Sequence, residues 1–227
     1  MADFFKFFRG GRNSEASVAA ELDRVTRRST GLNELARSLA RLDGQSVLDL
    51  GPTSPANIGF FTGLGERTYN EDVLLASRSP EYRTVADDGT AAMDVDKFMA
   101  ENLTFQPETF DAVLLWDMPD YLHESLVKPV VMRIHQISKP GALLLAFFHT
   151  KDAGADAPYQ RYHIAAPDTL ELQRIPAPQP GGINGRNSHF RLQRVFNNRH
   201  IENLFHDFSS IKFFLGRDNV REVLVVR

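Results

Sequence analysis

The chain has 227 residues, of which 42% are hydrophobic and 24% charged, and it carries a formal net charge of −3. This composition is typical of one globular domain with a full core, and the charge provides no overall basic field for binding nucleic acid. The absence of cysteine excludes disulfides, thiolate metal ligands and cysteine nucleophiles. No run approaches the ~20 apolar residues of a membrane span, so we expect no transmembrane segment and a cytoplasmic location.

The first 44 residues predict a helical extension. Residues 1–12, MADFFKFFRGGR, are rich in phenylalanine and basic, and they suit a surface helix that docks on its own domain, on a partner or on a membrane surface; the alternative is a disordered terminus. Apolar residues then recur at three- and four-residue spacings over 14–42, with a break at 29–31. The pattern indicates two helices before a main domain at 45–227.

Strands and helices alternate in the next hundred residues. Apolar runs predict strands at 46–50, 67–70, 110–116 and 142–148, with a faint strand at 91–95. Helical periodicity is found at 60–64, 73–82 and 124–138. Such alternation indicates an α/β fold with a parallel sheet.

The C-terminal third changes character. Two short strands at 161–164 and 169–174 precede a stretch rich in proline, glycine and asparagine at 176–188, which reads as a mobile loop or a lid. We therefore expect an inserted β hairpin and loop at about 155–190. A helix ending at Leu204 follows, and strands at 211–215 and 220–226 form a terminal hairpin.

The stretch SVLDLGPTSPANIGFF at 46–61 carries the main functional signal. A buried strand stops at Gly51, where backbone N–H groups can approach a ligand without a side chain between them; the alternative is an ordinary strand-ending turn. Asp72 stands 23 positions after Asp49 (72 − 49), beside Glu71. A carboxylate at this distance suits the ribose hydroxyls of a nucleoside.

From residue 45 to residue 227 the chain resembles the class I S-adenosylmethionine-dependent methyltransferases. VLDLG at 47–51 is similar to the first motif of that family, FDAVLLWDMPDYL at 110–122 to its fourth-strand motif, and ISKPGALLLAFF at 137–148 to its passage into the fifth strand. The hairpin at 211–226 matches its reversed last strand. The resemblance implies a Rossmann-like, mostly parallel seven-stranded sheet with helices on both faces and an antiparallel C-terminal hairpin.

The resemblance also implies S-adenosyl-L-methionine as cofactor and a set of binding residues. Asp96 would receive the adenine amino group, with Asp94 as the alternative and a helix cap as the structural explanation of either. The family's Gly-x-Gly-x-Gly loop is here Gly51, Thr53 and Pro55, so the loop must turn differently. The implied cofactor-binding residues are Asp49, Gly51, Pro52, Thr53, Ser54, Glu71, Asp72, Asp96 and Trp116.

Methyl transfer is an in-line displacement in which the cofactor supplies the reactivity, so the sequence leaves the catalytic residue unknown. Asp117 and His149 follow the strands at 110–116 and 142–148 and are candidate bases; a capping role for Asp117 and a structural role for His149 are the alternatives. The segment YQRYH offers Tyr159, Arg161 and Tyr162 as substrate contacts. The histidines do not stand at metal-ligand spacing, so we expect no metal site.

The sequence therefore favours a methyltransferase that acts on a small-molecule acceptor. The alternative is a catalytically silent binding or scaffold protein that has kept the methyltransferase fold. A nicotinamide-dependent oxidoreductase is the weakest hypothesis, because the chain has neither Gly-x-Gly-x-x-Gly nor a Tyr-x-x-x-Lys pair.

Overall fold

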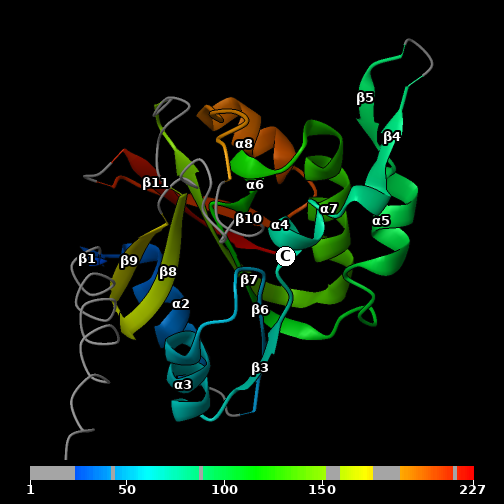
Figure 1. The fold of residues 1–227 in the computed structure, drawn as a ribbon. Helices are drawn as coiled ribbons and strands as arrows, with labels where there is room; N and C mark the ends of the chain where they lie inside the picture. Colours follow the sequence, from blue (N-terminus) through cyan, green and yellow to red (C-terminus); the bar gives the residue numbers. More distant parts are fainter. Residues whose placement is uncertain (1–23, 42–43, 87–88, 152–158, 176–189, 217–218) are drawn as a thin grey trace, which may run out of the picture.

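A mixed β-sheet forms the centre of the molecule (Figure 1). The computed structural model describes residues 24–41, 44–86, 89–151, 159–175, 190–216 and 219–227. Within these ranges the central sheet contains β2 (Ser46–Asp49), β3 (Arg67–Asn70), β6 (Phe110–Trp116), β7 (Ser138–His149), β10 (Ser210–Phe214) and β11 (Val220–Val226). Their spatial order is β10-β11-β7-β6-β2-β3.

The direction of the strands separates this sheet from an all-parallel one. The strands β3, β2, β6 and β7 run parallel, whereas β11 lies antiparallel to both β7 and β10. Continuous apolar runs explain the buried interior strands, because parallel strands are covered on both faces. The expected α/β fold and the reversed last strand are confirmed.

Helices cover both faces of the sheet, and each face has its own hydrophobic core (Figure 1). One face packs against α2 (Thr30–Leu39) and α3 (Pro55–Gly63). The helical elements of the other core are α4 (Val73–Ala76), η1 (Pro80–Tyr82), α5 (Val95–Glu101), α6 (Met118–Tyr121), α7 (Glu124–Ile137) and α8 (Asn198–Leu204).

The third strand of the expected seven does not join the central sheet. Residues Ala91–Met93 form β5, which pairs with β4 (Arg83–Val85) in a separate hairpin that projects at the upper right of Figure 1. These strands are three residues long and largely exposed, so they offer no apolar face that could be buried between two layers of helices. The prediction of seven strands was therefore wrong by one within the described residues.

A second, three-stranded sheet lies over the α3 side of the molecule. It contains β1 (Arg24–Arg28), β9 (Thr169–Ile175) and β8 (Tyr159–Ala166), in the order β1-β9-β8. β8 and β9 pair antiparallel as a hairpin; that this hairpin is an insertion stays a prediction. The prediction of a helix at 24–28 was wrong: RVTRR contains two β-branched residues, and its backbone pairs with β9. The Phe-rich segment lies outside the described residues.

A buried ion pair joins the start of the described chain to its end. Arg27 Nη2 lies 2.6 Å from Glu222 Oε1, and both side chains are buried. The other oxygen, Oε2, accepts hydrogen bonds from Ser29 Oγ at 3.0 Å and from the Gly31 backbone N–H at 2.7 Å. Glu222 therefore fixes β1 and the first turn of α2 onto β11.

Candidate functional site

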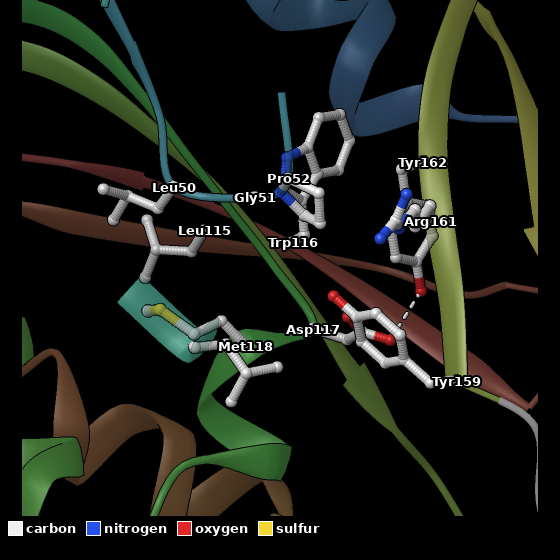
Figure 2. Close-up of a pocket in the computed structure, with 11 residues that line it drawn as sticks. Leu50, Gly51, Pro52, Leu115, Trp116, Asp117, Met118, Tyr159, Arg161 and Tyr162 are labelled. Carbon is white, nitrogen blue, oxygen red and sulfur yellow. Dashed lines mark hydrogen bonds between the residues drawn. The ribbon is translucent and has the colours of Figure 1, made fainter. Parts of the chain in front are cut away.

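A small cavity of about 10 Å³ lies at the carboxyl ends of β2 and β6 (Figure 2). This volume holds about one water molecule. The carboxyl edge of a parallel sheet is the usual place for a ligand in open α/β folds. The residues that line the cavity are Leu50, Gly51, Pro52, Leu74, Leu115, Trp116, Asp117, Met118, Tyr159, Arg161 and Tyr162.

Gly51 is covered by an indole ring. A Cβ atom at this position would lie 2.8 Å from Trp116 Cδ1 and 3.0 Å from Trp116 Nε1, closer than side chains pack. Its φ is not in the left-handed region, so the turn itself does not require glycine. The close approach of Trp116 explains the glycine at position 51.

Asp49 organises the inside of the loop. Its side chain is 2% exposed and accepts hydrogen bonds from the Gly51 N–H (3.0 Å), Trp116 Nε1 (2.6 Å) and Asn57 Nδ2 (2.8 Å). Burial raises the pKa of Asp49, while these three hydrogen bonds act in the opposite direction. Its oxygens bind the protein's own donors, so Asp49 positions the loop and Trp116.

Asn70, at the end of β3, holds the loop from outside. Its Nδ2 donates to the backbone oxygens of Asp49 (3.0 Å) and Gly51 (2.8 Å), and its Oδ1 accepts from Thr53 Oγ1. We did not anticipate this residue from the sequence; an amide at the end of the strand next to a glycine loop is the signal that could have found it. Thr53 therefore binds Asn70 and is not among the residues that line the cavity.

The next loop residue fixes the helix that follows. Ser54 is the N-cap of α3, where its Oγ accepts from the Asn57 N–H at 3.3 Å, and Pro55 occupies the first turn, where proline is favoured. Ser54 Oγ also lies 2.8 Å from His163 Nδ1 on β8. Like Thr53, Ser54 does not line the cavity.

β8 is held over the cavity by Asn57, in the first turn of α3. Asn57 Oδ1 accepts from the Ile164 N–H at 2.8 Å, and its Nδ2 donates to the Tyr162 backbone oxygen at 3.3 Å. The Tyr162 ring stacks on Trp116, with 5.2 Å between centroids and an interplanar angle of 1°. The backbone of β8 is thus anchored where it crosses the loop.

Asp117 forms one wall of the cavity and is buried. Tyr162 Oη donates to its Oδ2 at 2.9 Å, the bond drawn in Figure 2. Burial raises the pKa of Asp117 to about 7, against a lowering by the charge of His149 and a further increase from Asp120. The carboxyl group therefore exchanges a proton near neutral pH. Trp116, just before it, has a φ of 51°, a sparsely populated conformation for a bulky residue.

His149 lies beside this wall but does not line the cavity. Its Nδ1 lies 2.8 Å from Asp120 Oδ2, and the same oxygen accepts from the His149 backbone N–H at 2.7 Å. Burial raises the pKa of Asp120, and the hydrogen bonds from His149 oppose this. The structure pairs His149 with α6, which agrees with the structural alternative for this residue.

The two acidic residues after β3 are placed differently. Glu71 Oε1 accepts from the Leu103 N–H at 2.7 Å. Asp72 is half-buried, caps α4 through the Leu75 N–H at 2.9 Å, and lies near enough to Arg161 and Asp49 for their charges to act on its pKa, which burial raises. Neither Glu71 nor Asp72 lines the cavity. Of the two carboxylates, only that of Asp72 lies near enough to Arg161, a lining residue, for the charge to act on its pKa.

The expected adenine-binding acid is not at the cavity. Asp96 lies in the first turn of α5, and Asp94 caps that helix by accepting from the Lys97 N–H at 3.0 Å. Neither residue lines the cavity. The structure therefore does not bring Asp96 to the other candidate residues, and Asp94 has the capping role that we gave as the alternative.

Tyr159 and Arg161 close the cavity from β8 (Figure 2). Within the described residues, neither side chain forms a hydrogen bond. Tyr159 packs edge-to-face on Tyr121 and Phe190, with centroids 5.2 and 4.8 Å apart. Arg161 Nε is buried without a hydrogen-bond partner. These two side chains are held by packing, in contrast to the hydrogen-bonded Trp116 and Tyr162.

The described residues contain neither a metal-binding cluster nor a membrane-spanning helix. In these ranges no three His, Asp or Glu side chains are grouped so that they could hold a metal ion. Across the same part of the chain, every helix is too short or too polar to cross a membrane.

Comparisons with known proteins give only distant similarities. No protein-family model matches the chain, and no curated protein does. Among solved structures, the chain is similar to 1,6-didemethyltoxoflavin-N1-methyltransferase of Burkholderia thailandensis, solved with S-adenosylhomocysteine bound: identity is 13%, the TM-score is 0.44, and the match covers 98% of this chain and 93% of that one.

Two further structures show the same level of similarity. An amino pentose methyltransferase of Micromonospora echinaspora, solved with S-adenosylmethionine bound, is 13% identical over the whole of both chains, with a TM-score of 0.42. A possible exported protein of Bordetella parapertussis is 15% identical, with a TM-score of 0.45; the match covers 86% of this chain and 66% of that one. Similarities this distant add no weight to a functional conclusion, which depends on the strand order and the site.

Proposed function

We propose that the chain is an S-adenosylmethionine-dependent methyltransferase that acts on a small-molecule acceptor. The supporting observation is a coincidence at one edge of the sheet. The last strand of the sheet is reversed. Asp72, which follows β3, is half-buried and lies near enough to Arg161 for that charge to act on its pKa. Gly51, which follows β2, and Asp117 line the cavity at this edge. This is the edge at which open α/β folds bind nucleotides.

The residues at this edge have the chemical groups to bind the cofactor, but the cavity is too small to hold it unless side chains move. Asp72 offers carboxylate oxygens for two ribose hydroxyls. The cavity of about 10 Å³ is far smaller than the roughly 300–1,000 Å³ of a small-molecule site. Tyr159 must turn away and Arg161 must change its side-chain conformation before a nucleoside can enter. Since neither side chain forms a hydrogen bond within the described residues, this costs no hydrogen bond.

When bound, the cofactor supplies an electrophilic methyl group, and the protein contributes position and proton transfer. In this proposal Asp72 binds the ribose, while Gly51 and Pro52 form the loop on which the nucleoside rests. Asp117 accepts the proton that the acceptor loses, because its carboxyl group exchanges a proton near pH 7. Tyr162 holds that carboxyl group in position.

Isothermal titration calorimetry with S-adenosylmethionine and S-adenosylhomocysteine tests the proposal. We expect micromolar binding to the wild type and at least tenfold weaker binding to Asp72→Asn, because asparagine keeps the N-cap of α4 but replaces a carboxylate oxygen with a donor. Asp94→Asn is the matched control: it makes the same change at the cap of α5, away from the cavity, and should bind like the wild type. Equal affinities of the two variants would contradict the role of Asp72.

A specific observation also favours the silent-fold alternative. The Trp116 indole occupies the space beside Gly51 that the loop leaves open, and the cavity in this conformation holds about one water molecule. For a silent protein, neither ligand would give heat or a thermal shift at millimolar concentration.

A cytoplasmic location and the docking of the Phe-rich segment stay predictions.

A further inference from the structure

Arg161 is a cation at the cavity that has no counter-ion among the described residues. It projects from β8 among the residues that line the cavity, opposite the Gly51–Pro52 loop (Figure 2). In the described part of the chain it forms no ion pair and no hydrogen bond, and its Nε is buried. A buried guanidinium N–H without an acceptor is costly, so its position calls for an anionic partner.

The acidic residues near Arg161 do not supply that partner. Asp72 is close enough for the charge of Arg161 to lower its pKa, but its Oδ1 caps α4 and no ion pair is formed. Asp117 is engaged by Tyr162, and Asp49 is saturated by Gly51, Trp116 and Asn57. The guanidinium is thus the cationic group of the cavity left to meet a ligand.

We propose that Arg161 binds a carboxylate of the ligand in this cavity. The inference rests on the proposed function and specifies the ligand chemistry of the same site. A guanidinium can hold a carboxylate through two parallel N–H···O bonds, and exclusion of water strengthens such a pair. The carboxylate comes from one of two sources: the aminoacyl tail of the cofactor or the methyl acceptor itself.

A pair of ligands that differ only in the carboxylate tests this directly. Calorimetry compares S-adenosylmethionine with its decarboxylated form on the wild type, on Arg161→Met and on Arg174→Met. Arg174 lies on the neighbouring strand β9 and is exposed, so its variant has the same net charge as Arg161→Met. If the cofactor is the source, the wild type and Arg174→Met prefer S-adenosylmethionine by about 10- to 100-fold, and Arg161→Met loses that preference.

Arg161→Met could instead act indirectly, by changing the charge on Asp72. In that case the binding of S-adenosylmethionine and of its decarboxylated form would weaken equally, which would contradict the proposal. A second set of titrations covers the acceptor as the source: benzoate and succinate are added to the free protein and to the protein saturated with S-adenosylhomocysteine. Binding to the wild type that Arg161→Met abolishes supports the proposal. If Arg161→Met changes neither the ligand preference nor carboxylate binding, the proposal is wrong.

If the proposed function itself is wrong, the titrations give a different result. In that case the wild type binds none of the nucleosides, and the titrations of the free protein with benzoate and succinate decide the role of Arg161 alone. Circular dichroism and thermal unfolding of each variant exclude a loss of folding as the cause of lost binding.

Discussion

Gly51 is required in this loop, but for a different reason from the one that the sequence suggests. From the sequence we interpreted the missing side chain at Gly51 as space for a ligand. In the structure the indole ring of Trp116 occupies that space. The ring belongs to a residue 65 positions away (116 − 51), and only the pairing of β2 with β6 brings the two together. A local motif cannot reveal such a contact.

We expect Gly51→Ala to destabilise the protein by about 1–3 kcal/mol, because the new methyl group lies within 2.8 Å of Trp116 Cδ1. Urea unfolding followed by tryptophan fluorescence measures this at the relevant ring. Gly59→Ala, in α3, meets no atom within 4 Å and should stabilise the helix by about 0.5–1 kcal/mol. Equal stabilities of the two variants would show that Trp116 does not pack on Gly51 in solution.

Asp117 should make the stability depend on pH in an unusual direction. Its pKa is raised in the folded state to about 7, so between about pH 4 and 7 the folded state holds a proton that the unfolded state has lost. The contribution of this group therefore falls as pH rises through that window and is constant above it.

The substitution Asp117→Asn isolates this contribution, because an amide keeps an acceptor for Tyr162 and does not ionise. Between pH 5 and pH 8.5 the wild type loses the contribution of Asp117, and the variant has none to lose. The free energy of unfolding of the variant should therefore rise by about 2–3 kcal/mol relative to that of the wild type over this range. Denaturant unfolding at the two pH values gives the difference. If the difference between the free energies of unfolding of the two proteins is the same at both pH values, the pKa of Asp117 is not raised by folding.

At the scale of elements, the strands that were predicted correctly have short-range signals. Continuous apolar runs mark β2, β6 and β7, and a Gly/Asn turn between alternating strands marks β10 and β11. β1 was missed because its partner, β9, lies 141 to 149 residues away: Arg28 pairs with Thr169 (169 − 28) and Arg24 with Gln173 (173 − 24). The contacts of Asn57 and Asn70 were missed for the same reason, since both bind backbone groups of other elements.

The attachment of β8 to α3 depends on Asn57, which is 1% exposed. We expect Asn57→Ala to cost about 2–4 kcal/mol, since it leaves the Ile164 N–H and Asp49 Oδ2 without their partner. Hydrogen exchange should accelerate at Tyr162 and Ile164 and stay unchanged in β10. Asn203→Ala, on the exposed side of α8, is the control. Unchanged exchange in β8 would mean that other contacts hold the strand.

The N-terminal attachment depends on the ion pair between Arg27 and Glu222. Arg27→Met should cost about 3–5 kcal/mol, because it leaves a buried carboxylate without its cation. Glu222→Gln keeps an acceptor for Ser29 and Gly31. Combining the two substitutions should cost less than the sum of the single losses. Additive losses in a double-mutant cycle of unfolding free energies would show that the two residues do not interact.

At the scale of the whole molecule, the central sheet and the three-stranded sheet bring distant segments of the chain to one carboxyl edge. Residues from β6, from β8 and from the loop after β2 meet at the cavity although they are far apart in sequence. The sequence predicted the edge and most of its residues, because strand ends are readable from apolar runs. It could not predict the closed cavity, which depends on how the side chains of β8 pack over the loop.

The most direct test of this account is a crystal structure of the protein grown with millimolar S-adenosylhomocysteine. We expect the nucleoside between Gly51 and Asp72, with Tyr159 turned outward and with the Trp116–Tyr162 stack unchanged. A structure that retains the closed cavity of about 10 Å³, without ligand density at this edge of the sheet, would contradict the proposed function.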